Sequence, residues 1–239
     1  MSELLEIALN GHGGLKRWQE IDTLTARVTV SGLLFGMKGK PDPFRNSEVI
    51  VARKQPRTIY APFGGTGQRG VFEGGRVAIE TDAGAPVQAR DNPRQAFATH
   101  KRETQWDDLD LLYFGGYAMW NYLCAPFFLA MPGFTVREIE PWQEDDETWR
   151  RLAVTYPAGF PAHCAEQVLY FDAAGLHRRV DYGPDVLGRT PVTHYCYDHK
   201  DFGGIVVPTR RRAMLRGPDN HPQPGPVAVS IDIHSVVPD

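Results

Sequence analysis

One long uncharged stretch limits what this chain can fold into. From Leu111 to Val136 there is no Asp, Glu, Lys or Arg, and a stretch of that length could cross a bilayer as a helix. Residues that interrupt a membrane-spanning helix lie within it: Gly115, Gly116, Asn121, Pro126, Pro132 and Gly133. No cluster of Lys or Arg at either edge would fix an orientation across a membrane. We therefore expect a helix enclosed in a protein core, without stable insertion into a membrane.

Apolar residues recur at three- and four-residue spacing through this stretch, which is the pattern of an α-helix with a broad buried face. We expect this helix near Leu112 to Met131. It carries more aromatic surface than one buried helix face needs, so part of that surface should line a cavity. The aromatic candidates for ligand contact are Tyr113, Tyr117, Trp120 and Phe127.

Much of the remaining sequence alternates apolar and polar residues, which predicts strands with one buried face. Strands are expected at 24–30, 47–53, 57–62, 69–73, 76–80, 134–140, 149–156, 165–172, 176–182, 193–199, 205–216 and 227–236. The strands at 165–172 and 176–182 should form a hairpin, because Gly175 ends a tight turn between them. The prediction is a mainly β (α+β) protein with one domain over residues 1–239. Its strongly curved antiparallel sheet would be an open half-barrel of about 10–12 strands enclosing the apolar helix.

Charge and cysteine content indicate which partners and which compartment to expect. The formal net charge of −3 provides no positive field that would attract nucleic acid. Cys124, Cys164 and Cys196 are an odd number without close pairing, as expected for free thiols in a reducing compartment. The first residues also lack the basic region of a signal peptide. We therefore expect a soluble cytoplasmic protein, with its oligomeric state left open.

Four segments resemble a known superfamily. They are residues 10–18 (NGHGGLKRW), 21–24 (IDTL), 170–176 (YFDAAGL) and 202–211 (FGGIVVPTRR). Together they resemble LolA/LolB-like proteins, the bacterial lipoprotein-carrier superfamily, and suggest a cytoplasmic branch of it. The resemblance covers most of the chain. It implies an open β half-barrel whose concave side is closed by helices.

Three functions are compatible with such a half-barrel. The first is binding of a hydrophobic small molecule, lipid-like or aromatic and in one version anionic, in the cavity beside the helix. The alternative is a cofactor-free biosynthetic enzyme of the cyclase or isomerase type, because the resemblance extends to VioE, an enzyme of violacein biosynthesis with the same fold. The third is that the helix fills the half-barrel and no ligand exists. No cofactor and no metal are expected.

Two arginines share the parity of buried residues on their predicted strands. Arg178 alternates with apolar residues in 176–182, and Arg211 does so in 205–216. Both are therefore expected to point into the concavity, where a pair of guanidinium groups could bind a carboxylate or phosphate. The structural alternative is that each arginine forms an ion pair with a carboxylate or extends to the rim of the barrel.

The segment 193–199 concentrates reactive side chains on one strand. Strand parity places Tyr195, Tyr197 and His199 on one face and His194, Cys196 and Asp198 on the other. The first set is a candidate for acid–base catalysis, and the second has residue types that bind metals. Neighbours two apart on a strand are too extended to chelate a metal without ligands from another element, so the catalytic candidates are His199, Tyr195 and Tyr197.

His163 and Cys164 immediately precede a predicted strand. A His–Cys pair could form a thiol nucleophile, but adjacent residues point apart and the sequence identifies no Asn or Asp to orient the histidine. We therefore do not assign catalysis to this pair.

Overall fold

The computed structural model describes residues 2–239, and its central feature is one antiparallel sheet. In the first half of the chain the strands are β1 (Thr23–Ser31), β2 (Phe44–Ala52), β3 (Arg57–Ala61), β4 (Gln68–Glu73), β5 (Arg76–Thr81) and β6 (Pro86–Asp91). In the second half they are β7 (Thr135–Glu144), β8 (Glu147–Thr155), β9 (Glu166–Phe171), β10 (His177–Tyr182), β11 (Val192–Phe202), β12 (Ile205–Leu215) and β13 (Val229–Pro238).

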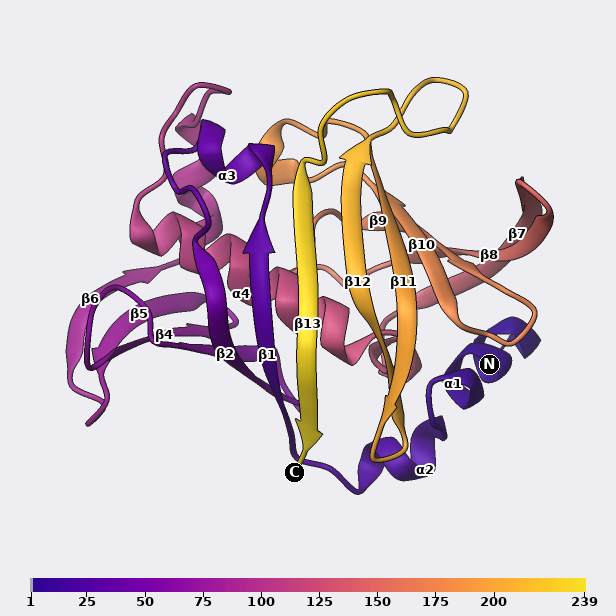
Figure 1. Cartoon of the computed structure of the whole chain (residues 1–239), viewed down its shortest axis with the longest axis horizontal. Helices are drawn as coiled ribbons and strands as arrows, with labels where there is room; N and C mark the ends of the chain where they lie inside the picture. The colour runs from indigo at the N-terminus through magenta and orange to yellow at the C-terminus, as the bar shows by residue number, and fades with distance from the viewer. Residues whose placement is uncertain (1) are drawn as a thin grey trace.

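The α-helices are α1 (Glu3–Gly11), α2 (Gly14–Gln19), α3 (Leu33–Met37) and α4 (Asp108–Cys124). The described residues also form three short 3₁₀ helices: η1 (Pro93–Thr99), η2 (Phe127–Ala130) and η3 (Asp185–Leu187). In Figure 1 the sheet curves around α4, which passes behind β2, β1 and β13. The face of the sheet toward α4 is called the inner face below, and the opposite face is called the outer face.

The strand order shows two meanders joined at one place. Over residues 2–239 the order is β6-β5-β4-β3-β2-β1-β13-β12-β11-β10-β9-β8-β7. Within each meander, β1 to β6 and β7 to β13, every strand lies beside its sequence neighbours. The meanders are joined by the pairing of β1 with β13, which runs from Leu24 opposite Pro238 to Ser31 opposite Ser230. The edges β6 and β7 do not pair with each other, so the sheet stays open. The predicted curved half-barrel around an apolar helix is confirmed, as is the hairpin of β9 and β10.

The central helix begins with a capping box. The Asp107 carboxylate accepts a hydrogen bond from the backbone N–H of Asp110 at 2.8 Å, and the Asp110 carboxylate accepts one from the N–H of Asp107 at 3.3 Å. Arg90 pairs with both carboxylates. From Leu109 to Cys124 every residue of α4 is buried, as the uncharged sequence predicted. Among the described residues, no helix has both the length and the apolar character needed to cross a membrane.

Two adjacent glycines allow α4 to lie directly on the sheet. A Cβ added at Gly116 would lie 2.4 Å from Cβ of Phe72, and one added at Gly115 would lie 2.8 Å from Cζ of Phe44. The sheet also donates hydrogen bonds to the helix, because Tyr60 Oη donates to the Gly115 carbonyl at 3.0 Å and Thr58 Oγ1 to the Gly116 carbonyl at 2.9 Å. The glycines that argued against a membrane span are therefore places where the helix backbone lies directly against side chains of the sheet.

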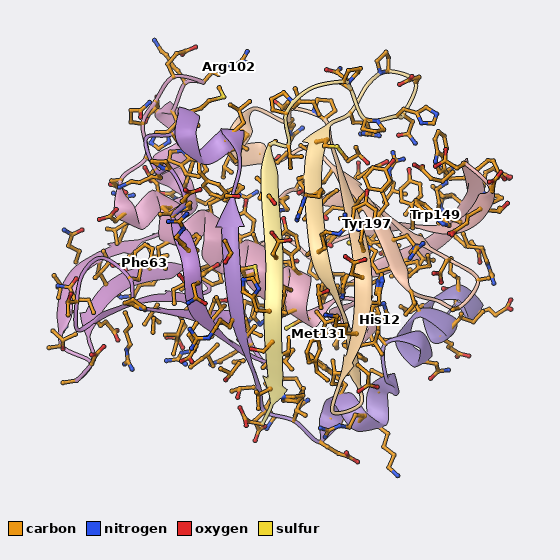
Figure 2. The ribbon with its side chains drawn as sticks, in the orientation of Figure 1. His12, Phe63, Arg102, Met131, Trp149 and Tyr197 are labelled. Carbon is orange, nitrogen blue, oxygen red and sulfur yellow. The ribbon has the colours of Figure 1, made fainter. Side chains whose placement is uncertain are left out.

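The connection between α1 and α2 is tied to the second meander by a buried histidine. His12 Nε2 accepts a hydrogen bond from the backbone N–H of His177 at 3.1 Å, so its proton is on Nδ1, which donates to the Val206 carbonyl at 2.7 Å. The next residue, Gly13, has a φ of 112° and lies so close to Gly204 that a Cβ would meet the Gly204 carbonyl. The Gly-rich segment 11–14 thus holds His12, which is labelled in Figure 2, where it bonds to the backbones of both β10 and β12.

Candidate ligand-binding site

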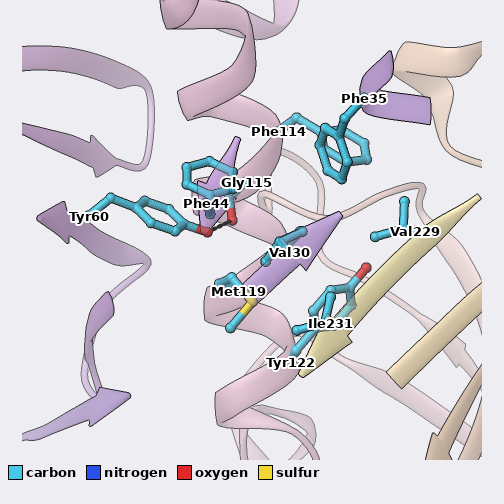
Figure 3. A pocket seen from close by; sticks show the side chains of 11 residues that line it. Val30, Phe35, Phe44, Tyr60, Phe114, Gly115, Met119, Tyr122, Val229 and Ile231 are labelled. Carbon is cyan, nitrogen blue, oxygen red and sulfur yellow. Dashed lines mark hydrogen bonds between the residues drawn. The ribbon is translucent and has the colours of Figure 1, made fainter. Parts of the chain in front are cut away.

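Two small cavities lie between α4 and the inner face of the sheet. The first has a volume of about 20 Å³ and an apolar lining that includes Val30, Phe35, Phe44, Met119 and Ile231. Figure 3 shows these side chains converging from α3, α4 and the strands. The second cavity is equally small, about 20 Å³. Each volume is enough for about one water molecule, so neither cavity holds a larger ligand without movement of its walls.

The lining of the second cavity is much more polar than that of the first. It includes Asn121 and Tyr122 from α4, His163 from the connection between β8 and β9, His177 from β10 and Arg211 from β12. Tyr122 also lines the first cavity, so its side chain lies between the two. The lining of this cavity therefore combines one cationic side chain with several neutral polar ones.

Arg211 is the unusual residue of this site. Arg211 is only 1% exposed, and its guanidinium lies 4.5 Å from the ring centroid of Tyr122. Nε donates to His194 Nε2 at 3.3 Å, whereas Nη1 and Nη2 are buried without a hydrogen-bond partner in the described part of the chain. No carboxylate within residues 2–239 forms a salt bridge with it. An unpaired buried charge is costly, so this guanidinium is suited to bind an anion.

A second buried arginine, on the outer face, shows how the same sheet satisfies a guanidinium. Both Arg179 Nε and Nη2 donate to the Asp181 carboxylate, at 2.8 and 2.9 Å. Nη1 donates to Glu144 and Tyr195, and Nη2 also donates to the carbonyl of Asn220. The comparison shows that Arg211 differs from Arg179 in lacking counter-ions, although both side chains are buried.

A chain of hydrogen bonds leads away from Arg211 into the core. Because Arg211 Nε always carries a proton, it is the donor, and His194 Nε2 must accept the hydrogen bond. Neutral His194 then carries its own proton on Nδ1. His194 Nδ1 donates to the hydroxyl oxygen of Tyr182 at 3.1 Å. The Tyr182 hydroxyl is in turn within 3.3 Å of the Tyr122 hydroxyl, to which it can donate.

The chain continues from Tyr122 to Tyr117 through His163. The Tyr122 hydroxyl lies 2.7 Å from His163 Nε2, and Tyr117 Oη lies 3.0 Å from His163 Nδ1. If Tyr182 donates to Tyr122, then Tyr122 donates to Nε2 and His163 carries its proton on Nδ1. With Tyr182 as the donor to Tyr122, the whole chain runs in one direction from Arg211 to Tyr117.

Burial keeps these histidines neutral. It lowers the pKa of His163 to about 3, with a smaller effect from the charge of Arg94. Burial also lowers the pKa of His177 and His194 well below the usual value, and the Arg211 charge contributes to both shifts. Burial raises the pKa of Tyr122 to about 12. At neutral pH the site therefore contains one cation, Arg211, among uncharged donors and acceptors.

The direction of the chain gives a spectroscopic prediction. In ¹⁵N-labelled protein at pH 7, His194 and His163 should both be neutral with the proton on Nδ1, and Arg211→Met should release His194 from this constraint. Nitrogen chemical shifts distinguish the two neutral tautomers. A proton on Nε2 of His194 in the unaltered protein would contradict the proposed direction of the chain.

The structure does not bring the two predicted arginines together. Arg211 points to the inner face as expected, but Arg178 is part-exposed on the outer face. There it lies 5.8 Å from the Trp149 ring centroid and pairs with Glu147 at 3.4 Å. The expected inward orientation of Arg178 is wrong because the pairing of β10 with β9 shifts register between His177 and Arg179. This β-bulge reverses the side-chain parity on which the prediction depended.

The catalytic candidates on β11 are also separated. Tyr195 and Tyr197 stack 5.9 Å apart on the outer face, where the Tyr195 hydroxyl donates to Glu144 at 2.7 Å. His199 instead lies beside His12, 6.0 Å between ring centroids, and its Nε2 contacts the His177 carbonyl at 3.1 Å. Between them Asp198 has a left-handed backbone (φ 55°), which interrupts the regular alternation. None of the three lines either of the two cavities.

The alternative metal-type set on β11 also fails to assemble. Asp198 is exposed and pairs with Arg210 at 2.6 Å, whereas His194 is fully buried. Within residues 2–239 no group of three or more His, Cys, Asp or Glu side chains could hold a metal ion.

The aromatic candidates on the helix pack in the core beside the cavities. The Trp120 indole is fully buried and donates to the Ala52 carbonyl at 2.8 Å, while Phe127 stacks on Trp18 with 4.3 Å between ring centroids. Tyr117 belongs to the hydrogen-bonded chain, and the Tyr113 hydroxyl accepts a hydrogen bond from Arg94 at 3.2 Å. The α4 residues that do line the polar cavity are Asn121, Tyr122 and, just beyond the helix, Ala125.

The curved sheet, the enclosed helix and the cavities between them define an open half-barrel protein. No family model and no curated protein matches the sequence. Its structure is similar to a LolA superfamily protein from Nitrosomonas europaea, with 11% identity, a TM-score of 0.53, and 99% of this chain and 92% of that chain covered. It is also similar to a domain from Vibrio parahaemolyticus named for outer membrane lipoprotein sorting, with 8% identity, a TM-score of 0.54, and coverage of 97% and 90%. The chain therefore has the LolA-like fold, as the resemblance predicted.

Proposed function

We propose that this protein binds a hydrophobic small molecule with an anionic group between α4 and the inner face of the sheet. The observation that carries the proposal is the Arg211 guanidinium, buried, without a counter-ion and with Nη1 and Nη2 unpaired among residues 2–239. A bound carboxylate or phosphate would supply both the missing charge and the missing acceptors. The free energy gained there would offset the rearrangement that a ligand larger than the present cavities requires.

The apolar part of the ligand would extend toward the first cavity. Tyr122 lines both cavities, so rotation of its side chain would join the polar end at Arg211 to the apolar end beside Phe44 and Met119. The similarity to a domain named for lipoprotein sorting supports a hydrophobic ligand. For the compartment we propose the cytoplasm, which suits three cysteines that are all free thiols in the structure.

A second candidate function is cofactor-free catalysis of an isomerase or cyclase type in the same cavity. The observation that favours it is His177, whose Nε2 lies 3.1 Å from the Arg179 carbonyl and must donate to it, which leaves the Nδ1 lone pair free to accept a proton. His177 lines the polar cavity together with Arg211. A substrate whose anionic group binds Arg211 would thus have a neutral base beside it. Tyr195, Tyr197 and His199 are not needed for this version.

The decisive test replaces Arg211 by Met, which keeps much of the side-chain volume and removes the charge. Octanoate and its methyl ester, and 3-phenylpropanoate and its methyl ester, are the probes. The acids should lose about 10- to 100-fold in affinity with Arg211→Met, corresponding to roughly 1.5–3 kcal/mol for a charged hydrogen bond, while the esters change little. Isothermal titration calorimetry measures both.

A matched control and a stability measurement accompany this test. Arg178→Met makes the same substitution on the outer face and should leave the affinity for both probes unchanged. Without ligand, Arg211→Met should raise the melting temperature, since it removes an uncompensated buried charge. If acid and ester lose affinity equally, the anionic-group proposal is wrong. If none of the four probes binds the unaltered protein, ligand binding of this class is refuted and the helix simply fills the half-barrel.

A further inference from the structure

Asn121 is a second incompletely paired group in the polar cavity. This α4 residue is only 7% exposed. Its Nδ2 donates two hydrogen bonds of 2.8 Å, to the carbonyls of Tyr117 and Pro161. Its Oδ1 is buried and has no hydrogen-bond donor anywhere in the described residues.

The two carbonyls fix which way the amide points. A 180° flip of the Asn121 side chain would place Oδ1 against two carbonyl oxygens and lose both hydrogen bonds. Oδ1 is therefore held as an acceptor without a donor in the described residues, on a side chain that lines the same cavity as Arg211. Two residues that line this cavity thus carry unpaired groups among residues 2–239: the donors Nη1 and Nη2 of Arg211 and the acceptor Oδ1 of Asn121.

We propose that this cavity selects ligands whose anionic group has a hydrogen-bond donor on a neighbouring atom, such as a 2-hydroxy carboxylate or a carboxylate beside an N–H. The inference rests on the proposed function and deepens it. Arg211 would bind the carboxylate, and the adjacent hydroxyl or N–H would donate to Asn121 Oδ1. A plain carboxylate satisfies Arg211 but offers no donor to the buried amide oxygen, so it gains one hydrogen bond fewer than the hydroxy acid.

The cavity must widen to admit such a head group. Its volume of about 20 Å³ holds about one water molecule, so a carboxylate with a neighbouring donor enters only if the walls move. A water molecule could accept from Arg211 and donate to Asn121, but it cannot neutralise the guanidinium charge. A carboxylate with an adjacent hydroxyl supplies the charge, the acceptors and the donor together.

The test compares octanoate with each enantiomer of 2-hydroxyoctanoate by isothermal titration calorimetry. One enantiomer should bind the unaltered protein about fivefold more tightly than octanoate, the effect of one neutral hydrogen bond to a buried acceptor. Asn121→Leu, nearly isosteric, should abolish this preference while octanoate still binds. Arg211→Met should weaken all three acids together and keep the preference.

The outcomes separate the inference from the proposed function. If octanoate and both hydroxy acids bind with equal affinity, the inference is overturned and the proposed function stands. If none of them binds, the proposed function fails as well. Because the comparison of ligands on the unaltered protein decides the point, it does not depend on Asn121→Leu folding. A preference that survives in folded Asn121→Leu, judged by far-UV circular dichroism, also overturns the role of Asn121.

Discussion

Lowering the pH from 7.5 to 5 should remove most of the stability of this protein. The cause is a set of fully or almost fully buried histidines that the fold keeps neutral: His12, His163, His177 and His194. Burial lowers the pKa of His12 to about 4 and of His163 to about 3, and those of His177 and His194 fall well below the usual value. In the unfolded chain each histidine titrates near pH 6.5.

Acid lowers the free energy of unfolding because the unfolded chain binds more protons than the folded protein does. Between about pH 6.5 and pH 4 the unfolded chain binds protons that the folded protein cannot bind, so the free energy of unfolding falls as the pH falls. The stabilising effect is complete above pH 6.5 and is lost progressively below it. Each buried histidine contributes about 1.4 kcal/mol per pH unit in this window. Four of them acting together would consume a total stability of about 5–15 kcal/mol within one to three pH units.

Urea unfolding at a series of pH values between 7.5 and 5 measures this dependence. His163→Gln should reduce the slope of stability against pH by about 1.4 kcal/mol per pH unit. His234→Gln is the matched control, because it makes the same substitution at a position that is exposed on β13. A free energy of unfolding that stays constant from pH 7.5 to pH 5 would mean that these histidines are not buried and neutral.

Trp120→Ala should destabilise the protein by about 3–5 kcal/mol, the usual cost of deleting a fully buried large aromatic side chain. The indole is enclosed by Phe128 and Phe160, at 6.1 and 5.6 Å between ring centroids, and its N–H donates to the Ala52 carbonyl. It lines neither cavity described here. Urea unfolding at pH 7.5 measures the loss, and Trp120→Phe, which keeps most of the packing, should cost clearly less. Reduced octanoate binding with unchanged stability would instead make Trp120 a ligand contact, as its place on the helix suggested.

Much of the fold could be predicted because its signals are local. Alternation of apolar and polar residues marks most strands, and the uncharged stretch marks α4. The strand β6 could not be found this way, because nearly all of its residues are exposed and it has no buried face to create a pattern. The helix α3 spans only Leu33–Met37, too short for helical periodicity to show.

The site was harder to predict because its contacts are distant in sequence. Arg211 was identified since its strand is regular, whereas the bulge beside Arg178 left no trace in the alternation. His163 was considered only as a partner of Cys164. Its actual partners, Tyr117 and Tyr122, lie more than forty residues away, and no local pattern encodes such a contact. In the sequence Asn121 only argues against a membrane-spanning helix, whereas its two carbonyl partners in the structure fix the orientation of its amide.

The pairing of β1 with β13 also has a consequence for how the molecule folds. Each meander consists of hairpins between sequence neighbours, which close short loops and form quickly. The joint between the meanders brings Leu24 opposite Pro238, the most distant pairing in the sheet and the one with the largest loss of chain entropy. Until it forms, the sheet exists as two curved pieces with unpaired edges. The helix α4, which carries Asn121, packs mainly on the first piece, whereas Arg211 belongs to the second, so the binding site should be the last part of the molecule to assemble.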